Sequence, residues 1–191
     1  MRDFASCLLF LPLIDSSIPI SAQVVAPTFE ELFAEASAAR EANNLSQSIE
    51  LYTQASQVNP RSAEVWWFLG SLNYRKESYG PAKAALSRYL ELTPDAAPAL
   101  ALRGLCEFEM GEFQPALADI EKGIARGAAN DSHNQQILRY HEALLLTKRG
   151  RFEDALKSYA FFAQHQITSP ELLIAIGLAV NLLAKRPGKS N

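Results

Sequence analysis

The chain has 191 residues, of which 48% are hydrophobic and 20% are charged, and its formal net charge is −3. This composition is ordinary for a globular protein with one continuous core, and nothing in it divides the chain into two domains. The slight acidity argues against nucleic acid as a general partner, because phosphate binding needs a basic surface.

The first 28 residues precede any repeated pattern. Arg2 is followed by an apolar run from Phe4 to Ile14 and then by small and polar residues that lead to Ala22. That layout is similar to a secretory signal peptide over residues 1–22, with residues 23–28 as a linker, and the run is too short to span a membrane. We therefore expect a periplasmic or secreted protein. The alternative is a cytoplasmic protein with the same array and a leader that stays attached.

From residue 29 onward, a pattern typical of paired helices restarts at a regular interval. The restarts are at Phe29, Ala63, Ala97, Gln136 and Pro170, in steps of 34, 34, 39 and 34 residues. A period in this range indicates an array of stacked units, none of which can bury its apolar face alone.

Small residues recur where the two helices of each pair must approach closely, and bulky residues follow in the second helices. The small residues are Ala36, Gly70, Gly104, Ala143 and Gly177. The bulky ones are Tyr52, Leu86, Ile120 and Tyr159. This alternation predicts a densely packed helix pair in each unit.

The second unit carries the pattern most fully, in Trp66, Leu69, Gly70, Tyr79, Ala82, Leu86, Tyr89 and Pro94. It resembles the tetratricopeptide repeat family, whose unit is a pair of antiparallel helices closed by a proline. The resemblance covers residues 29–183 and ends on a fifth first-helix, with residues 184–191 as a polar tail. It implies an all-α, right-handed solenoid of about four and a half units.

The motifs of catalysis and metal binding are incomplete. His141 and Glu142 begin like a zinc-protease helix, but Leu145 stands where the second histidine must project. Cys106, the single cysteine beyond the leader, fits a small buried hydrophobic residue better than a nucleophile. We therefore expect no enzyme activity, no metal and no cofactor. An enzyme with an unrecognised site, around His133 to His141, is the less favoured alternative.

We expect the stacked first helices to line the hollow side of the array. Trp66 and Trp67 cannot both face the core of their pair, because neighbours on a helix are about 100° apart. If Trp66 is the core residue, Trp67 points to the hollow side, and equivalent positions extend an apolar groove. The predicted groove residues are Phe33, Trp67, Tyr74, Leu105, Phe108, Tyr140 and Leu144.

Aromatic anchors are enriched where proteins hold their partners, so the predicted function is a scaffold that binds a peptide or protein segment along this groove. The alternative is that several of these aromatics only pack between adjacent units. Chaperone-binding members of the family hold a terminal carboxylate with lysines, asparagines and an arginine. The matching positions here are neutral or apolar, which predicts no binding of chaperone tails. They are Phe33, Ser37, Phe68, Pro98 and Leu102.

Two irregularities carry further expectations. The 39-residue step adds residues around 128–135, and we expect a longer protruding loop there. The last predicted helix is apolar nearly all round, from Leu172 through Leu183, although a terminal unit normally needs a polar outer face. We expect Leu178 and Leu182 to form a docking face, covered by self-association with a second copy or by a capping helix of a longer chain.

Overall fold

The computed structural model describes residues 26–128 and 131–185, so the predicted signal peptide over residues 1–22 lies outside the described residues, as does most of the polar tail. The described part of the chain forms nine helices and no strand. They are α1 (Phe29–Glu41), α2 (Leu45–Val58), α3 (Ala63–Arg75), α4 (Tyr79–Leu92), α5 (Ala97–Glu109), α6 (Phe113–Ala125), α7 (Ser132–Lys148), α8 (Phe152–Gln164) and α9 (Pro170–Ala184). None of these helices is long and apolar enough to cross a membrane.

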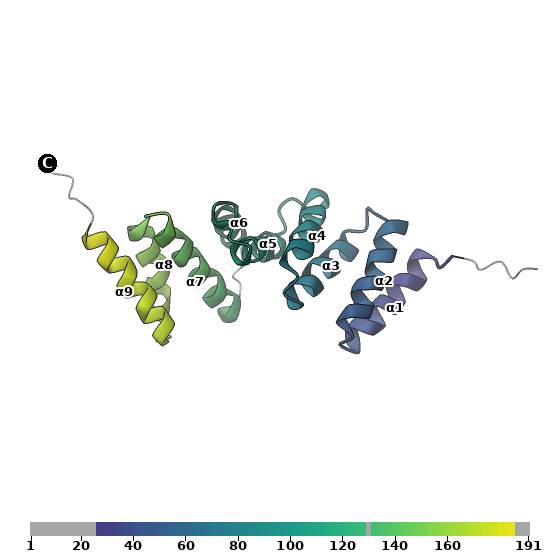
Figure 1. The fold of residues 1–191 in the computed structure, drawn as a ribbon, viewed down its shortest axis with the longest axis horizontal. Helices are drawn as coiled ribbons and strands as arrows, with labels where there is room; N and C mark the ends of the chain where they lie inside the picture. Colours follow the sequence, from purple (N-terminus) through teal and green to yellow (C-terminus); the bar gives the residue numbers. More distant parts are fainter. Residues whose placement is uncertain (1–25, 129–130, 186–191) are drawn as a thin grey trace, which may run out of the picture.

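The helices form pairs that follow one another along the longest axis of the molecule, with α1 near one end and α9 at the other (Figure 1). Each first helix packs on the second helix of its own unit, and that second helix packs on the next unit. First helices of successive units are also in contact: α3 with α5, α5 with α7, and α7 with α9. The predicted all-α solenoid is confirmed.

Local sequence explains where the first helices begin and end. Thr28 and Glu31 form a reciprocal capping box at the start of α1, and the side chain of Ser62 caps α3. Asn43 and Gly111 follow the first helices of their units with φ of 57° and 77°, the left-handed backbone that asparagine and glycine tolerate best. The chain can therefore reverse within three residues and pack the second helix antiparallel to the first.

The predicted alternation of small and bulky residues is present in the core. A Cβ atom placed on Gly70 would lie 2.7 Å from Cγ of Leu86, and one placed on Gly104 would lie 2.7 Å from Cγ1 of Ile120. Leu86, Ile120 and Tyr52 are fully buried. The helix pairs therefore approach closely because the first helix offers almost no side chain at the crossing point.

The irregular step lengthens a helix as well as a connection, which corrects our expectation of a loop over residues 128–135. Helix α7 begins at Ser132, one turn before Gln136, and has 17 residues where α1, α3 and α5 have 13. The physical reason is a cap: Asp131 accepts a hydrogen bond from the backbone N–H of Asn134 at 2.8 Å, which starts the helix early. Ala128, expected in a protruding loop, is buried.

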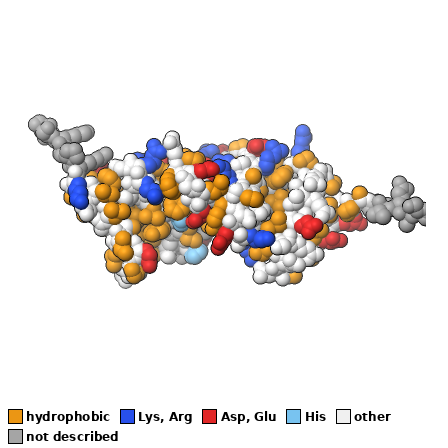
Figure 2. Space-filling model, viewed as in Figure 1, with side chains coloured by type: hydrophobic (Ala, Val, Ile, Leu, Met, Phe, Trp, Pro, Cys, Tyr) orange, Lys and Arg blue, Asp and Glu red, His pale blue; other side chains and the backbone are white. Residues whose placement is uncertain are grey.

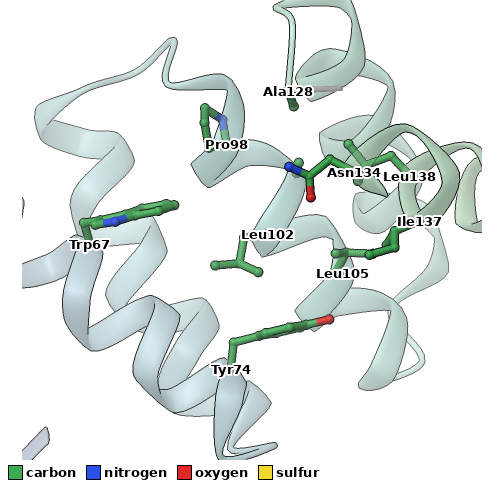
Figure 3. A pocket seen from close by; sticks show the side chains of 10 residues that line it. Trp67, Tyr74, Pro98, Leu102, Leu105, Ala128, Asn134, Ile137 and Leu138 are labelled. Carbon is green, nitrogen blue, oxygen red and sulfur yellow. The ribbon is translucent and has the colours of Figure 1, made fainter. Parts of the chain in front are cut away.

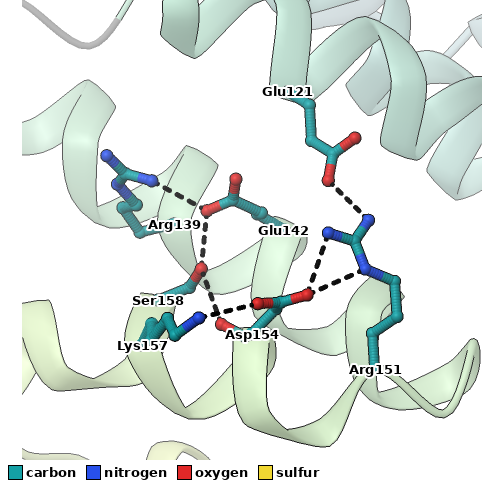
Figure 4. Close-up of polar contacts among 7 residues, drawn as sticks. All are labelled: Glu121, Arg139, Glu142, Arg151, Asp154, Lys157 and Ser158. Carbon is teal, nitrogen blue, oxygen red and sulfur yellow. Dashed lines mark hydrogen bonds and ion pairs between the residues drawn. The ribbon is translucent and has the colours of Figure 1, made fainter.

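An ion-pair network joins the third and fourth units across this irregular step (Figure 4). Arg151, at the start of α8, donates to Glu121 of α6 at 2.9 Å and to Asp154 of α8 at 3.0 Å. Beside it, the half-exposed Arg139 and the buried Ser158 both donate to the Glu142 carboxylate. The Arg151–Glu121 pair is the contact of this group that crosses from the fourth unit to the third, and the others lie within the fourth unit.

Candidate binding groove

A cavity of about 320 Å³ lies between α3, α5 and α7, and we call it the central cavity (Figure 3). Trp67 and Tyr74 enter from α3, two turns apart on one face, and Leu102 of α5 lies between their rings in the view. The opposite wall comes from α7. The complete lining is Trp67, Tyr74, Pro98, Ala101, Leu102, Leu105, Ala128, Asn134, Ile137 and Leu138.

The chemistry of the central cavity is apolar. Its ten lining residues include no charged side chain, and their polar groups are the Asn134 amide, the Tyr74 hydroxyl and the Trp67 indole N–H. Burial, followed by the nearby Cys106, raises the pKa of Tyr74 above its ordinary value, so the phenol stays neutral at physiological pH. Such a lining suits an aliphatic or aromatic side chain with a few fixed hydrogen bonds at its edge.

A second cavity, of about 410 Å³, lies beside the first between α7, α8 and α9. Ile137 lines both cavities, and Tyr140 and His141 line the second. The Nδ1 atom of His141 is 2.7 Å from the carbonyl oxygen of Ile137. A carbonyl oxygen only accepts, so Nδ1 is the donor in this contact.

A third cavity, of about 300 Å³, lies between α1 and α3 and has a different character. Trp67 lines it as well as the central cavity, but the other walls include Arg40 and Arg75. The Arg40 guanidinium sits 4.4 Å above the ring of Phe68. Trp67 lines both the first and the third cavity and Ile137 lines both the first and the second, so the three cavities are neighbours; arginines line the third, whereas no charged residue lines the central one.

The structure places the predicted groove residues in more than one environment. Trp67, Tyr74 and Leu105 meet in the central cavity, and Tyr140 lines the neighbouring one. Leu144 is half-buried against the core.

The other two predicted groove residues line none of these three cavities. Phe33 packs edge-on against Tyr52, with ring centroids 5.5 Å apart, and Phe108 packs edge-on against His141 at 4.7 Å. Trp67 and Tyr74 make ring contacts of the same kind, with Tyr89 and Tyr79, so these contacts do not separate groove residues from packing residues.

Several lining residues were not predicted. Pro98 and Leu102 line the cavity, but the sequence pattern identified them only as positions of a carboxylate clamp. Ile137 and Leu138 lie in the lengthened α7. The available signal was their apolar character on a first helix, one position or one turn from the predicted register. It was not decisive, because the phase of α7 depends on where that helix starts.

The positions of the carboxylate clamp hold no cation. Phe33 and Phe68 pack around Tyr52, whose hydroxyl is 2.9 Å from Oγ of Ser37. Pro98 and Leu102 line the central cavity. These groups offer a terminal carboxylate no compensating charge.

The buried ionisable groups near the groove do not form a reactive centre. Burial, together with the neighbouring Glu107, raises the pKa of the Cys106 thiol to about 12, so no thiolate is available at neutral pH. Burial also raises the pKa of Glu107 to about 7, with Asp119 as the next cause. Within residues 26–128 and 131–185, no group of three His, Cys, Asp or Glu side chains is placed to hold a metal ion.

Comparison with known proteins agrees with this architecture. A family model described as tetratricopeptide repeat matches residues 33–97. Residues 33–97 therefore carry tetratricopeptide repeats, and the nine described helices have the fold of a tetratricopeptide repeat array. Its fold is similar to that of the crystal structure of MamA protein, with a TM-score of 0.69 and 18% identity over 83% of this chain and 84% of that one. It is also similar to YrrB, a repeat protein with an unusual peptide-binding site, with a TM-score of 0.60 and 15% identity over 82% and 87% of the two chains.

The curated relatives are longer proteins. Protein FlbA of Caulobacter vibrioides is 27% identical over 124 residues, which are 65% of this chain and 20% of that protein. Serine/threonine-protein phosphatase 5 of Rattus norvegicus is 30% identical over 128 residues, 66% of this chain and 25% of that protein. This repeat protein therefore spans a quarter or less of these relatives, and their activities do not transfer with the shared repeats.

Proposed function

We propose that this tetratricopeptide repeat protein is a scaffold that binds an apolar peptide or protein segment along its concave groove, with the main anchor in the central cavity. The observation that carries the proposal is an apolar cavity, free of charged lining residues, between three successive first helices. The unusual peptide-binding site described for YrrB supports this use of the fold. The proposal assigns no catalytic step to the chain.

The lining of the groove indicates the chemistry of the bound segment. The space between Trp67, Tyr74 and Leu102 suits an aliphatic or aromatic side chain of the bound segment. Burying such a side chain there favours binding by about 1.5–3 kcal/mol. Toward α1 the groove presents Arg40 and Arg75, with Glu41 as the single acidic group. We expect the preferred segment to carry an acidic residue on the α1 side of its apolar anchor.

The test uses peptides selected on the intact protein from a random display library. Binding of the selected peptides is then measured by fluorescence anisotropy on wild type, on Leu102→Asp and on Leu92→Asp. Leu102 lines the central cavity, whereas Leu92 is an exposed leucine at the end of α4. We expect Leu102→Asp to weaken binding by about a hundredfold, as for a central apolar contact, and Leu92→Asp to leave it unchanged.

Equal binding by wild type and Leu102→Asp would contradict the assignment of the anchor. Because Leu102 is half-buried, circular dichroism must first show that its variant keeps the helical content of wild type. Tyr74→Ala, which shortens a side chain at the cavity wall, serves as a second and milder variant. We expect it to weaken binding by about tenfold.

We also propose that the protein is exported, on the strength of the apolar run from Phe4 to Ile14 and the small residues before Gln23. Mass spectrometry of the mature protein from its native cells is expected to find an N-terminus at or near Gln23. An intact N-terminus on the cytoplasmic protein would support the cytoplasmic alternative instead.

A further inference from the structure

Helix α9 packs on α8 and carries the same close-approach position as the first helices of the other units, but no described residue packs on that position. Gly70 and Gly104 occupy this position in the second and third units, where an added Cβ atom would lie 2.7 Å from Leu86 or Ile120. Gly177 is their equivalent in the fifth unit, and a Cβ atom there would have no described atom within 4 Å. The backbone surface that receives a second helix elsewhere is therefore open on α9.

The residues one turn to either side of Gly177 are exposed in the same way. Leu173 and Val180 are 59% and 49% exposed, whereas their equivalents in the third unit, Leu100 and Glu107, are 2% and 4% exposed. We call Leu173, Gly177 and Val180 the open face of α9. Figure 2 shows hydrophobic side chains gathered over this end of the molecule.

The open face continues into a wider apolar surface on the same helix. Ile174 is 72% exposed, and the predicted docking residues Leu178 and Leu182 are 52% and 36% exposed. Contiguous exposed apolar side chains on one helix mark an interaction site when the patch is large. We propose that the open face of α9 binds the same face of a second copy, with the two α9 helices antiparallel across a two-fold axis near Gly177.

The sequence of α9 is suited to pairing with itself. Gly177 is the middle residue of Pro170–Ala184, so two antiparallel helices that cross there overlap along their full length of about 22 Å. Leu173 and Ile174 of one copy then lie against Val180 of the other, on either side of the glycine contact. Bulky side chains fill the space that the small central residue opens, as they do within units two and three.

Charge favours the antiparallel arrangement as well. Glu171, in the first turn, is the single charged residue of α9, and Lys185 follows the last turn. Antiparallel pairing brings Glu171 of one copy to the end of the second copy's helix, near Lys185. It also sets the two helix dipoles in opposite directions. One short helix from each copy forms the contact, so we expect a reversible dimer.

Sedimentation velocity over a range of concentrations tests the proposal on the full chain. The variants are Leu173→Glu and Gly177→Leu, with Val58→Glu as the control. Val58 is 55% exposed at the end of α2, far from α9 along the array. We expect a wild-type dimer whose dissociation constant rises by about tenfold or more in both α9 variants and is unchanged in the control.

The glycine variant makes the test decisive. Open space surrounds Gly177, and leucine forms helix better than glycine, so Gly177→Leu is expected to keep or raise the helical content of the monomer. Two leucines at the crossing point would nevertheless hold the paired helices apart. A wild-type chain that stays monomeric at every concentration overturns the proposal, and so does a dimer that both α9 substitutions leave intact. Leu102→Asp, in the groove, is expected to dimerise like wild type.

Discussion

Three glycines on first helices differ in what surrounds them, and alanine at each gives a graded prediction. An added Cβ atom at Gly104 would lie 2.7 Å from Cγ1 of Ile120 and also close to α6 backbone, 3.0 Å from the carbonyl oxygen of Ala116 and 3.1 Å from the Ile120 nitrogen. At Gly70 the near atoms are Cγ and Cδ2 of Leu86, and the nearest backbone atom is 3.5 Å away. At Gly177 nothing described lies within 4 Å.

The expected magnitudes follow from two opposing terms. Alanine is better than glycine in a helix interior by about 1 kcal/mol, whereas overfilling a packed core costs about 1–3 kcal/mol. At Gly104 helix α6 itself must move, so we expect Gly104→Ala to lower the free energy of unfolding by about 2 kcal/mol. At Gly70 only a side chain must turn, and we expect a loss of about 1 kcal/mol or less. Gly177→Ala has no packing cost and should stabilise by about 0.5–1 kcal/mol.

Urea unfolding followed by far-UV circular dichroism measures the series, at a concentration low enough to keep the chain monomeric. The midpoints should fall in the order Gly177→Ala, wild type, Gly70→Ala, Gly104→Ala, with equal slopes. Equal midpoints for Gly104→Ala and Gly177→Ala would refute the reasoning, because the two substitutions differ only in the helix packed opposite.

Three further predictions concern charge. Because burial raises the pKa of Glu107 to about 7, the folded state holds a proton that the unfolded state releases near its ordinary pKa of about 4.3. Wild-type stability should therefore fall as pH rises between these values, and the urea midpoint of Glu107→Gln should exceed that of wild type increasingly over this window. Calorimetry with an acidic C-terminal chaperone peptide is expected to show no binding, and micromolar affinity would contradict the clamp argument. Arg151→Ala should leave the urea midpoint almost unchanged, since the Arg151 ion pairs are exposed.

The fold could be predicted from the sequence because each unit repeats the same packing requirement between its two helices. A small residue such as Gly104 and a bulky one such as Ile120 must meet wherever the period brings two helices together, and this pairing depends only on near neighbours in the chain. The extra turn of α7 did not follow. Its polar residues lack apolar spacing, and the helix starts early because of a single cap at Asp131.

The sequence predicted the groove less completely than it predicted the fold. Register brought Trp67, Tyr74 and Leu105 to one cavity, because the same face of successive first helices points the same way. Register could not show that Phe33 and Phe108 would lie outside the three cavities and pack against other rings. That outcome depends on partners from other helices, Tyr52 and His141, and helix phase alone carries no information about them.

The irregular step and the central cavity have one cause. The early start of α7 at Ser132 adds the turn that carries Asn134, and the same step buries Ala128, so both residues reach the cavity wall. A step of 34 residues would omit that turn and its cap. The five-residue departure from the period therefore builds part of the surface that we assign to the partner. In a repeat array the specific site is expected where the repetition breaks, because identical units would offer the same surface along the whole groove.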